Sequence, residues 1–334
     1  VDTSTITGSK IFVQLSAAVT HTCGVMTDGA IYCWGSDAAG LLGNGATAGT
    51  QSSPSAVDRT GVTGNTSFIQ VSAGTEHTCG ITSSGKAYCW GSDGFGELGN
   101  GATAGTQTSP SLVDTTTVTG MKSFLQITVG LHRTCAIMTD GAPYCWGSDD
   151  NGALGNGAGI TGNQTSPSPV DTSTVTGKKA FVQISAGDAT GGGAYVCGLT
   201  SELLAYCWGS DTNGLLGNGG GITGDQVSPS PVDVALVTGN KSFQRIAAGG
   251  THACAVTADG NVFCWGSDSV GQIGNGAALT SNQDSPVAVD TTGFSNEKGM
   301  LTVSTGYSHT CSLTPKGTAY CWGADTNGVL GNGD

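Results

Sequence analysis

The sequence predicts an all-β propeller of six four-stranded blades. Three observations predict this fold: one motif occurs in six copies, the copies recur every 56 to 62 residues, and short apolar segments alternate with glycine and proline clusters. This period is too long for helix-pair solenoids and close to one propeller blade. We therefore expect a single propeller domain over residues 1–334, with repeat units at approximately 1–56, 57–112, 113–169, 170–231, 232–288 and 289–334.

The repeated motif contains two cysteines ten positions apart, a tryptophan directly after the second, and a tail that ends in Gly-Asn-Gly in all six copies. Every cysteine belongs to such a pair: Cys23 and Cys33, Cys79 and Cys89, Cys135 and Cys145, Cys197 and Cys207, Cys254 and Cys264, Cys311 and Cys321. Zinc or haem sites need closer ligand pairs or histidines at matching intervals, which the sequence lacks. We therefore expect six disulfides, no metal and no cofactor, and an oxidising location in the periplasm, on the cell surface or outside the cell.

The spacing of the cysteines predicts the register of their hairpin. Residues 27–29 lie midway between Cys23 and Cys33, which suits a three-residue loop whose glycine takes the left-handed conformation. Met26 then faces Ala30 in a hydrogen-bonded pair. Counting back along both strands places the two cysteines opposite each other in a non-hydrogen-bonded pair, where Cα atoms are closest and a disulfide can form.

Two further positions of the motif predict packing between blades. The residue after the first cysteine is small in every copy, which favours close contact between blades: Gly24, Gly80, Ala136, Gly198, Ala255 and Ser312. The tryptophan after the second cysteine is expected in the core between blades: Trp34, Trp90, Trp146, Trp208, Trp265 and Trp322.

The charge and hydropathy of the chain disfavour two classes of partner. The net charge is -13, from 24 acidic and 11 basic side chains, and such a surface repels the phosphate backbone of nucleic acids. No apolar stretch reaches 18 residues, so we expect no membrane insertion, and no signal peptide precedes Val1. Val1-Asp2-Thr3 repeats the internal Val113-Asp114-Thr115, as a mature or trimmed product would.

The run H-T-C-x-x-T-x-x-G-x-x-Y-C-W-G-S-D-x-x-G-x-L-G-N-G resembles the repeat of the regulator of chromosome condensation family, in its cysteine-containing bacterial form. The resemblance covers all six units. It implies four-stranded blades, a ring closed by strands from both termini, and function through protein partners. Val1-Asp2 is expected to supply the segment that the last unit lacks. The best-known members have seven blades, so either a six-bladed ring closes or a longer chain has been cut; we favour six blades.

Repeated polar residues predict structural roles. A histidine precedes the first cysteine by two positions at His21, His77, His252 and His309 and is expected to form structural hydrogen bonds. An aspartate recurs in the Gly-Ser-Asp or Gly-Ala-Asp turn, where it would bond its own backbone or, as an alternative, hold calcium: Asp37, Asp93, Asp149, Asp211, Asp268 and Asp325. Catalysis needs a singular nucleophile or acid–base pair, and none stands apart from the repeat, so we expect no enzyme.

Departures from the repeat are the candidate binding residues, because copies that serve the fold alone need not differ. The fourth unit has five extra residues before its cysteine, in a segment beginning at Asp188, which predicts a loop that bulges from one propeller face. Aromatic and arginine side chains often anchor interfaces. The candidates are Tyr195, Asp188, Arg133, His132, Phe95 and Arg245. Neutral drift of surface loops explains the same pattern.

These features predict a non-enzymatic binding or adhesion module, secreted or on the cell surface. Its partner is expected to be a protein or glycan on a cell surface or in the envelope, held by loops on one propeller face. The alternative is a structural subunit of an extracellular filament, or a repeat domain of a larger surface protein, capable of self-assembly.

Overall fold

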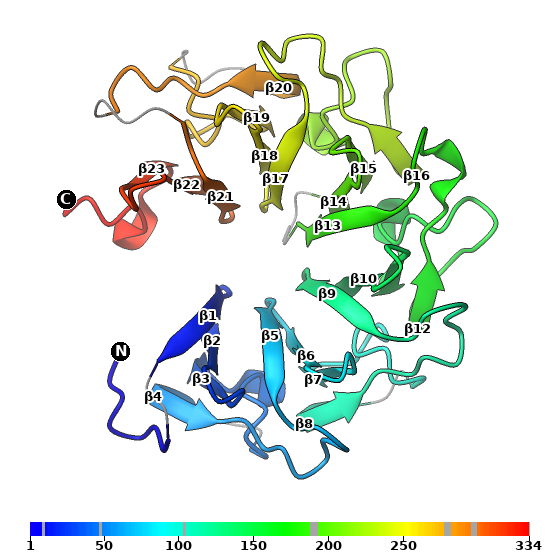
Figure 1. Cartoon of the computed structure of the whole chain (residues 1–334), viewed down its shortest axis with the longest axis vertical. Helices are drawn as coiled ribbons and strands as arrows, with labels where there is room; N and C mark the ends of the chain where they lie inside the picture. The colour runs from blue at the N-terminus through cyan, green and yellow to red at the C-terminus, as the bar shows by residue number, and fades with distance from the viewer. Residues whose placement is uncertain are drawn as a thin grey trace. The chain divides into compact units, whose positions relative to one another are not determined.

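The structure is a computed structural model that describes residues 1–8, 11–46, 49–102, 105–187, 193–276, 282–294 and 299–333. It is the predicted all-β propeller, with six blades of antiparallel strands and one disulfide in each blade (Figure 1). The described helices are short 3₁₀ turns: η1 (Ala38–Gly40), η2 (Asp150–Gly152), η3 (Thr172–Thr174), η4 (Thr212–Gly214) and η5 (Thr326–Gly328). No helix in these ranges is long and apolar enough to span a membrane.

The chain forms two compact units, Val1–Asp149 with Ile160–Val170, and Asp150–Gly159 with Asp171–Asp334. Residues 150–159 belong to the second unit and residues 160–170 to the first, and this division has a local cause. Residues 150–159 pack against the fourth blade, where Trp208 Nε1 donates to the carbonyl oxygen of Ala153 at 3.1 Å, whereas the strand that follows returns to the third blade. The single domain over 1–334 and its unit boundaries stay a prediction.

The first unit contains three blades, each a sheet of four strands in chain order. Their strands are β1 (Phe12–Ala17), β2 (His21–Met26), β3 (Ile31–Ser36) and β4 (Thr50–Ala56); β5 (Phe68–Ala73), β6 (His77–Thr82), β7 (Ala87–Gly91) and β8 (Gln107–Leu112); β9 (Phe124–Val129), β10 (Arg133–Met138), β11 (Pro143–Gly147) and β12 (Gln164–Pro169).

The second unit contains two further four-stranded blades and a last sheet of three described strands. Their strands are β13 (Phe181–Ala186), β14 (Tyr195–Thr200), β15 (Ala205–Gly209) and β16 (Gln226–Pro231); β17 (Phe243–Ala248), β18 (His252–Thr257), β19 (Val262–Gly266) and β20 (Gln283–Ala288); β21 (Thr302–Thr305), β22 (His309–Leu313) and β23 (Ala319–Gly323).

The predicted hairpin register is confirmed. In the first blade Cys23 faces Cys33, the Met26 amide donates to the Ala30 carbonyl at 2.8 Å, and Gly29 has a φ of 79°. The same pairing recurs in all six hairpins, and each disulfide joins Cα atoms 4.1 Å apart. The disulfides are therefore cross-strand links between the second and third strand of every blade.

Hydrophobic cores lie between neighbouring blades. In the first unit, the disulfide of the second blade (Cys79 and Cys89) packs with Phe124, Ala136 and Trp146 of the third. Four of the six tryptophans, Trp90, Trp146, Trp208 and Trp265, are fully buried, which agrees with their predicted place between blades. A hydrophobic surface that fits only the adjacent blade makes each blade dependent on its neighbours.

The small residue after the first cysteine also has a role within its own blade. A Cβ atom at Gly80 would lie 2.9 Å from the ring of Phe68, and one at Gly24 would lie 2.4 Å from the ring of Phe12. In both blades the phenylalanine comes from the first strand and lies across the second. The strand pair can close only where the side chain beneath the ring is absent or small.

The N-terminal segment lies on the first blade. Val1–Gly8 form no strand; Ile6 packs against Met26 and Tyr32, and Thr5 Oγ1 donates to the Pro54 carbonyl at 2.8 Å, so this segment lies on the first blade. Closure of the ring by strands from both termini stays a prediction.

Candidate functional site

Three of the four repeated histidines are structural bridges between blades. His21 Nε2 lies 2.8 Å from Thr78 Oγ1, and His77 Nε2 lies 2.7 Å from Thr134 Oγ1. The Thr134 hydroxyl donates to a tail carbonyl at 2.8 Å, that of Glu97, so it can only accept from the imidazole, which fixes Nε2 as the protonated nitrogen. His252 repeats the arrangement with Thr310 at 2.6 Å.

Burial keeps these histidines neutral. It lowers the pKa of His21 to about 4, and those of His77 and His252 to about 3. For His77 the neighbouring His132, His21 and Arg133 lower the pKa further. A neutral imidazole whose N–H is committed to a threonine supports the structural role that the repetition predicts.

The repeated aspartates close the tail turns. Asp93 Oδ1 accepts the amide of Leu98 at 3.1 Å, and Asp37 accepts that of Leu42 at the same distance. The bond spans five residues, so it encloses the whole turn, which is wider than the Asx turn expected. Among the described residues, no three or more histidine, cysteine or acidic side chains are grouped so that they could hold a metal ion.

Two of the predicted binding residues are buried, and this corrects the expectation of exposed anchors. Tyr195 is fully buried, and its hydroxyl lies 3.0 Å from the carbonyl oxygen of Gly249 and 2.7 Å from that of His252. Arg133 is 2 % exposed. Both replace the bridging histidine of the other copies, and Tyr195 lies in the contact between the fourth and fifth blades.

The other candidates lie in different surroundings. Arg245 is exposed on β17, where its Nη1 donates to the neighbouring carbonyl of Gln244 at 2.8 Å. Asp188 and the extra loop of the fourth unit lie outside the described residues. Phe95 and His132 lie together with Glu76, a residue that the repeat pattern did not single out.

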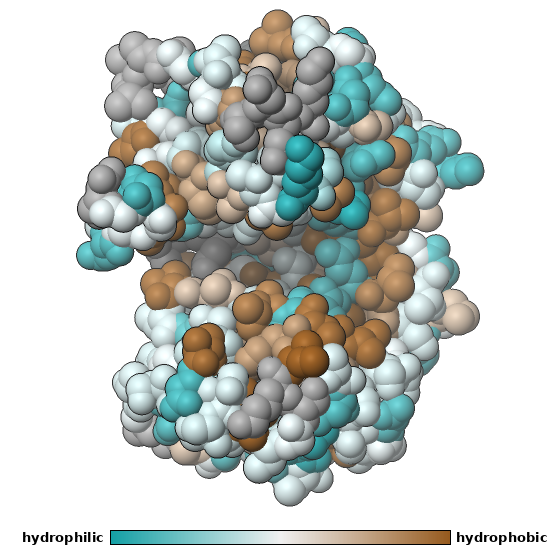
Figure 2. Space-filling view, turned by 60° about the vertical axis from the view of Figure 1, so that its left-hand side comes forward, coloured by the Kyte–Doolittle hydropathy of each residue, from teal (hydrophilic) through white to brown (hydrophobic). Residues whose placement is uncertain are grey.

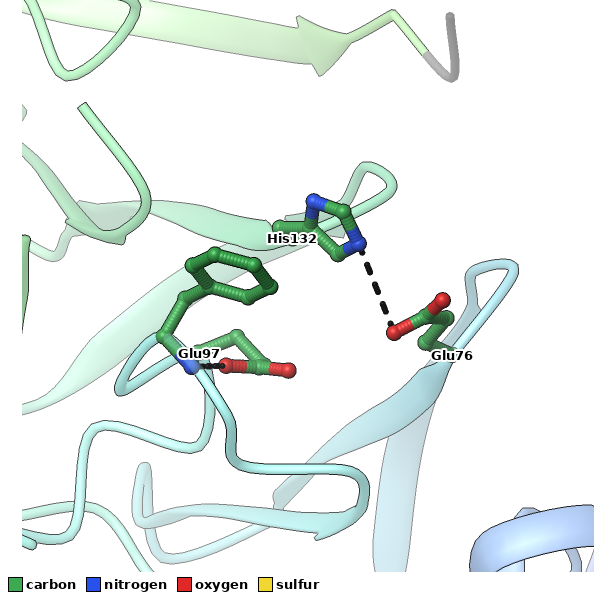
Figure 3. Close-up of polar contacts among 4 residues, drawn as sticks. Glu76, Glu97 and His132 are labelled. Carbon is green, nitrogen blue, oxygen red and sulfur yellow. Dashed lines mark hydrogen bonds and ion pairs between the residues drawn. The ribbon is translucent and has the colours of Figure 1, made fainter. Parts of the chain in front are cut away.

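Phe95, His132 and Glu76 form a partly exposed group, the Phe95 cluster (Figure 3). The rings of Phe95 and His132 stack with centroids 4.3 Å apart at 28°. His132 Nε2 lies 3.4 Å from Glu76 Oε2, and the two side chains are 24 % and 42 % exposed. Phe95 lies in the tail of the second blade, while His132 and Glu76 directly precede β10 and β6, so the group spans two blades.

Glu97 lies beneath this group and is fully buried (Figure 3). Its Oε2 accepts the Phe95 amide at 2.6 Å, while its Oε1 has no hydrogen-bond partner. Burial raises the pKa of Glu97, against the opposing effects of the Glu97 and Phe95 amides, the Ser92 hydroxyl and His132. Other copies have leucine, alanine, glutamine or valine at this position, and that contrast was the sequence signal for Glu97.

The charge of Glu97 also acts on Asp93 in the same tail. Burial raises the pKa of Asp93 to about 6, and the charge of Glu97 raises it further, while the Leu98 amide and Asn100 oppose the shift. Two buried carboxyl groups in one tail are unfavourable for folding. Such a cost, absent from most copies, marks this tail as the place where the chain departs most from a purely structural repeat.

Comparison with known proteins identifies the family. The chain matches the RCC1-like domain family over residues 2–334. It is 26 % identical to the ultraviolet-B receptor UVR8 of Arabidopsis thaliana, covering 96 % of this chain and 78 % of the receptor. It is 27 % identical to human E3 ubiquitin-protein ligase HERC2, covering 96 % of this chain but 6 % of the ligase.

Solved structures agree on the fold. Human WBSCR16 superposes with a TM-score of 0.80 at 18 % identity, covering 97 % of this chain and 79 % of that protein. Yeast RCC1 (Prp20), solved with Kap60, superposes with a TM-score of 0.78 at 19 % identity, covering 96 % and 72 % of the two chains. The six-copy repeat, its blades and these matches together show that the chain belongs to the family of RCC1-like domains.

Proposed function

We propose that this chain is a non-enzymatic module that binds a protein partner, with the Phe95 cluster as part of the contact surface. The observation that carries the proposal is the position of Phe95, His132 and Glu76, which are departures from the repeat and meet at a partly exposed place over two blades. An aromatic ring, an imidazole and a carboxylate offer a partner apolar contact and polar bonds within one small area.

The buried residues beneath the cluster support a contact site. Glu97 binds the backbone of Phe95 and thereby fixes the loop that presents the ring. A residue that holds a recognition loop at the expense of a buried charge favours function over stability. Three of the four repeated histidines, His21, His77 and His252, are by contrast buried and bonded to threonines, which leaves them unsuited to acid–base catalysis.

Exposed hydrophobic side chains on the inner strands of the first unit add to the interaction surface. Val13 and Leu15 on β1, Ile69 on β5 and Leu125 on β9 are each more than half exposed. Figure 2 shows hydrophobic side chains on the surface of the part that holds the N-terminal blades. Exposed apolar groups on neighbouring elements favour a protein contact.

Known structures of similar fold and the charge of the chain suggest the kind of partner. Yeast RCC1 was solved bound to Kap60, and Prp20p of Saccharomyces cerevisiae is described with binding to Gsp1p and histones. For this chain, a net charge of -13 favours a protein surface that is neutral or basic. Six disulfides favour a partner met in an oxidising compartment, on the cell surface or after secretion.

Site-specific photocrosslinking tests this function. A photoreactive phenylalanine analogue replaces Phe95 in one variant and Val270, the equivalent residue of the fifth blade, in another. We expect a discrete protein adduct from envelope or secreted extracts at position 95 and none at position 270. Glu76→Ala in the Phe95 variant should reduce its yield.

Equal adducts at both positions would contradict the proposal. So would adduct formation that does not respond to Glu76→Ala. A glycan partner would appear instead as binding on a glycan array that Glu76→Ala abolishes, with no protein adduct at position 95.

A further inference from the structure

Glutamine and serine side chains join the first strands of neighbouring blades. Gln14 on β1 accepts the amide of Val71 on β5 at 2.9 Å and donates to the carbonyl of Val71 at 2.9 Å. Two positions later, Ser16 Oγ accepts the amide of Ala73 at 2.9 Å. These two side chains, the Gln–Ser bridge, satisfy main-chain groups that a paired strand would otherwise satisfy.

The same bridge recurs in two other contacts between first strands, with bonds 2.8 to 3.1 Å long. It joins Gln70 and Ser72 on β5 to Ile127 and Val129 on β9, and Gln183 and Ser185 on β13 to Ile246 and Ala248 on β17. Each bridge gives an acceptor to two main-chain amides of the next blade. The glutamine and the serine are therefore part of the fold wherever the bridge is present.

The contact between β17 and β21, the first strands of the fifth and sixth blades, has other residues in place of the bridge. Arg245 stands at the glutamine position and Ala247 at the serine position. Within the described residues no hydrogen bond joins the Arg245 side chain to β21, and its Nη1 donates to the Gln244 carbonyl of its own strand at 2.8 Å. The two strands are still neighbours, because Ala247 packs against the hydrophobic cluster that contains Val303 of β21 (Figure 1).

Two main-chain amides of β21 face this contact. Val303 stands where Val71 stands in β5, opposite the residue that follows the first cysteine of its own blade. Two positions later, Thr305 stands where Ala73 stands. The register therefore directs the amides of Val303 and Thr305 away from β22 and toward β17. Val303 is 7 % exposed, so its amide has little access to water.

The replacement of the bridge leaves donors without acceptors. Glutamine and serine each offer an oxygen to an amide, whereas alanine offers none and a guanidinium carries only N–H donors. The amides of Val303 and Thr305 thus lie beside the exposed, positively charged Arg245. A buried amide without an acceptor is unfavourable, so this contact is complementary to an acceptor that comes from outside the chain.

We propose that the β17–β21 contact binds an acidic side chain of a peptide, whose carboxylate accepts from the Val303 amide and from Arg245. Bonds from arginine to a carboxylate are short, charge-assisted and often bidentate. The site lies on the fifth and sixth blades, so it is separate from the Phe95 cluster and does not depend on the function proposed for that cluster.

The spacing of the two amides favours a peptide over a small organic acid. Residues two positions apart on a strand are separated by about 6.6 Å, which is too far for one carboxylate to bond both amides well. The Thr305 amide therefore needs a second acceptor, which a peptide supplies from a main-chain carbonyl or a hydroxyl. A simple carboxylic acid can satisfy the Val303 amide alone.

Amide NMR of the whole 334-residue protein, labelled with ¹⁵N at valine and threonine, tests the site. The probes are blocked Gly-Glu-Gly, blocked Gly-Gln-Gly and sodium acetate. We expect the glutamate peptide to shift the amides of Val303 and Thr305, and acetate to shift that of Val303 only. The glutamine peptide should bind about tenfold more weakly, because its neutral oxygen forms a weaker bond to Arg245.

Rebuilding the bridge should abolish binding without unfolding the protein. The double variant Arg245→Gln with Ala247→Ser restores both acceptors. It should remove the response to the glutamate peptide, and hydrogen exchange of the Val303 and Thr305 amides should become slower. Circular dichroism checks that the variant remains folded.

The opposite change is the matched control. The double variant Gln183→Arg with Ser185→Ala removes an existing bridge, whose acceptors serve Ile246 and Ala248. The glutamate peptide should then shift the Ala248 amide as well, and hydrogen–deuterium exchange of Ile246 and Ala248 should become faster.

Three results would overturn the proposal. The first is slow exchange of the Val303 amide without peptide, equal to that of Val71, because the amide would then already have an acceptor. The second is an unchanged response in the rebuilt variant. The third is a shift of the Val303 amide by sodium chloride as large as that by acetate, which would show a general attraction of anions. A response of both amides to acetate, equal to that to the peptide, would overturn the peptide as occupant.

Discussion

The tails of the second and fifth blades each use a buried side chain to bind a backbone amide, but the side chain is a carboxylate in one and a neutral amide in the other. In both, a long polar side chain is fully buried and binds the amide two residues before it: Glu97 binds Phe95, and Gln272 binds Val270 at 2.9 Å. Phe95 and Val270 do not have a positive φ. At the same position of the repeat, the four other copies have a residue with positive φ: Ala39, Asn151, Asn213 and Asn327. The buried side chain thus replaces a left-handed backbone turn.

The two tails differ in how the second polar atom of that side chain is satisfied. Gln272 Nε2 donates to Thr251 Oγ1 at 3.1 Å. Glu97 has a second oxygen in place of the amide, and that oxygen has no partner. His132, which occupies the position of Thr251, stacks on Phe95 and turns to Glu76. The fifth blade is therefore satisfied internally, while the second holds an unfavourable charge beneath a partly exposed group.

The largest expected effect concerns a feature that the two blades share. The pKa values of His77 and His252 are lowered to about 3 in the folded protein, from 6.5 when unfolded, so the unfolded chain gains protons first as the pH falls. Stability is complete above pH 6.5 and decreases below it, by about 2 kcal/mol per histidine between pH 7 and pH 5. Urea unfolding at both pH values measures this loss.

The histidine variants sharpen the comparison. His77→Gln and His252→Gln should each reduce the pH dependence by the same amount, because the pKa of both histidines is lowered to about 3. A clear inequality would show that the difference between the two blades reaches beyond their tails.

The disulfides should show an effect of similar size, again equal in the two blades. Replacing Cys79 and Cys89 by serine, or Cys254 and Cys264 by serine, removes a disulfide between two cysteines that are ten positions apart. Each double variant should lose roughly 2–3 kcal/mol of unfolding free energy. Thermal unfolding at neutral pH gives the values, and a difference of more than about 1 kcal/mol would break the expected symmetry.

Exchange of the buried side chains should produce effects of opposite sign. Glu97→Gln removes a buried charge and should raise stability by about 1–2 kcal/mol, while Gln272→Glu should lower it by a similar amount. Because the Glu97 charge raises the pKa of Asp93, Glu97→Gln should also lower that pKa, which carbon NMR titration can follow. Destabilisation by Glu97→Gln would contradict the interpretation of Glu97 as unfavourable for folding.

The smallest effect tests the pair of positions directly. In the fifth blade Gln272 donates to Thr251. The double variant Glu97→Gln with His132→Thr introduces the equivalent bond in the second blade. A double-mutant cycle should give a favourable coupling of about 0.5–1 kcal/mol. The same variant should lose the photocrosslinked partner while remaining folded; retention of the partner would separate stability from recognition at this site.

Much of the fold could be predicted because its determinants are local in sequence. The ten-residue spacing of Cys23 and Cys33 allows one hairpin register, and the loop glycine fixes the turn between them. Repetition then carries that register to every blade. The structural role of His77 was predicted in the same way, since a histidine repeated at four equivalent positions does not form a singular site.

The candidate site was predicted only in part. Phe95 and His132 were chosen as departures from the repeat and do lie together, but Tyr195 and Arg133 were chosen by the same rule and are buried. Both occupy the register position of the bridging histidine, which alternation along the strand places on the face of the first cysteine. The position of each departing residue along its strand predicts whether its side chain is buried, and would have distinguished Tyr195 and Arg133 from the exposed candidates.

The sequence by itself determined the period, the hairpin register, the disulfide pairing and the family, because each depends on spacing within a single repeat. Only the tertiary structure decided which departures meet, since Glu76 and His132 lie on different blades 56 positions apart and touch through packing. It also decided that Glu97 is buried without a partner for one oxygen. Contacts between blades depend on the faces that two repeats bring together, and no single repeat contains that information.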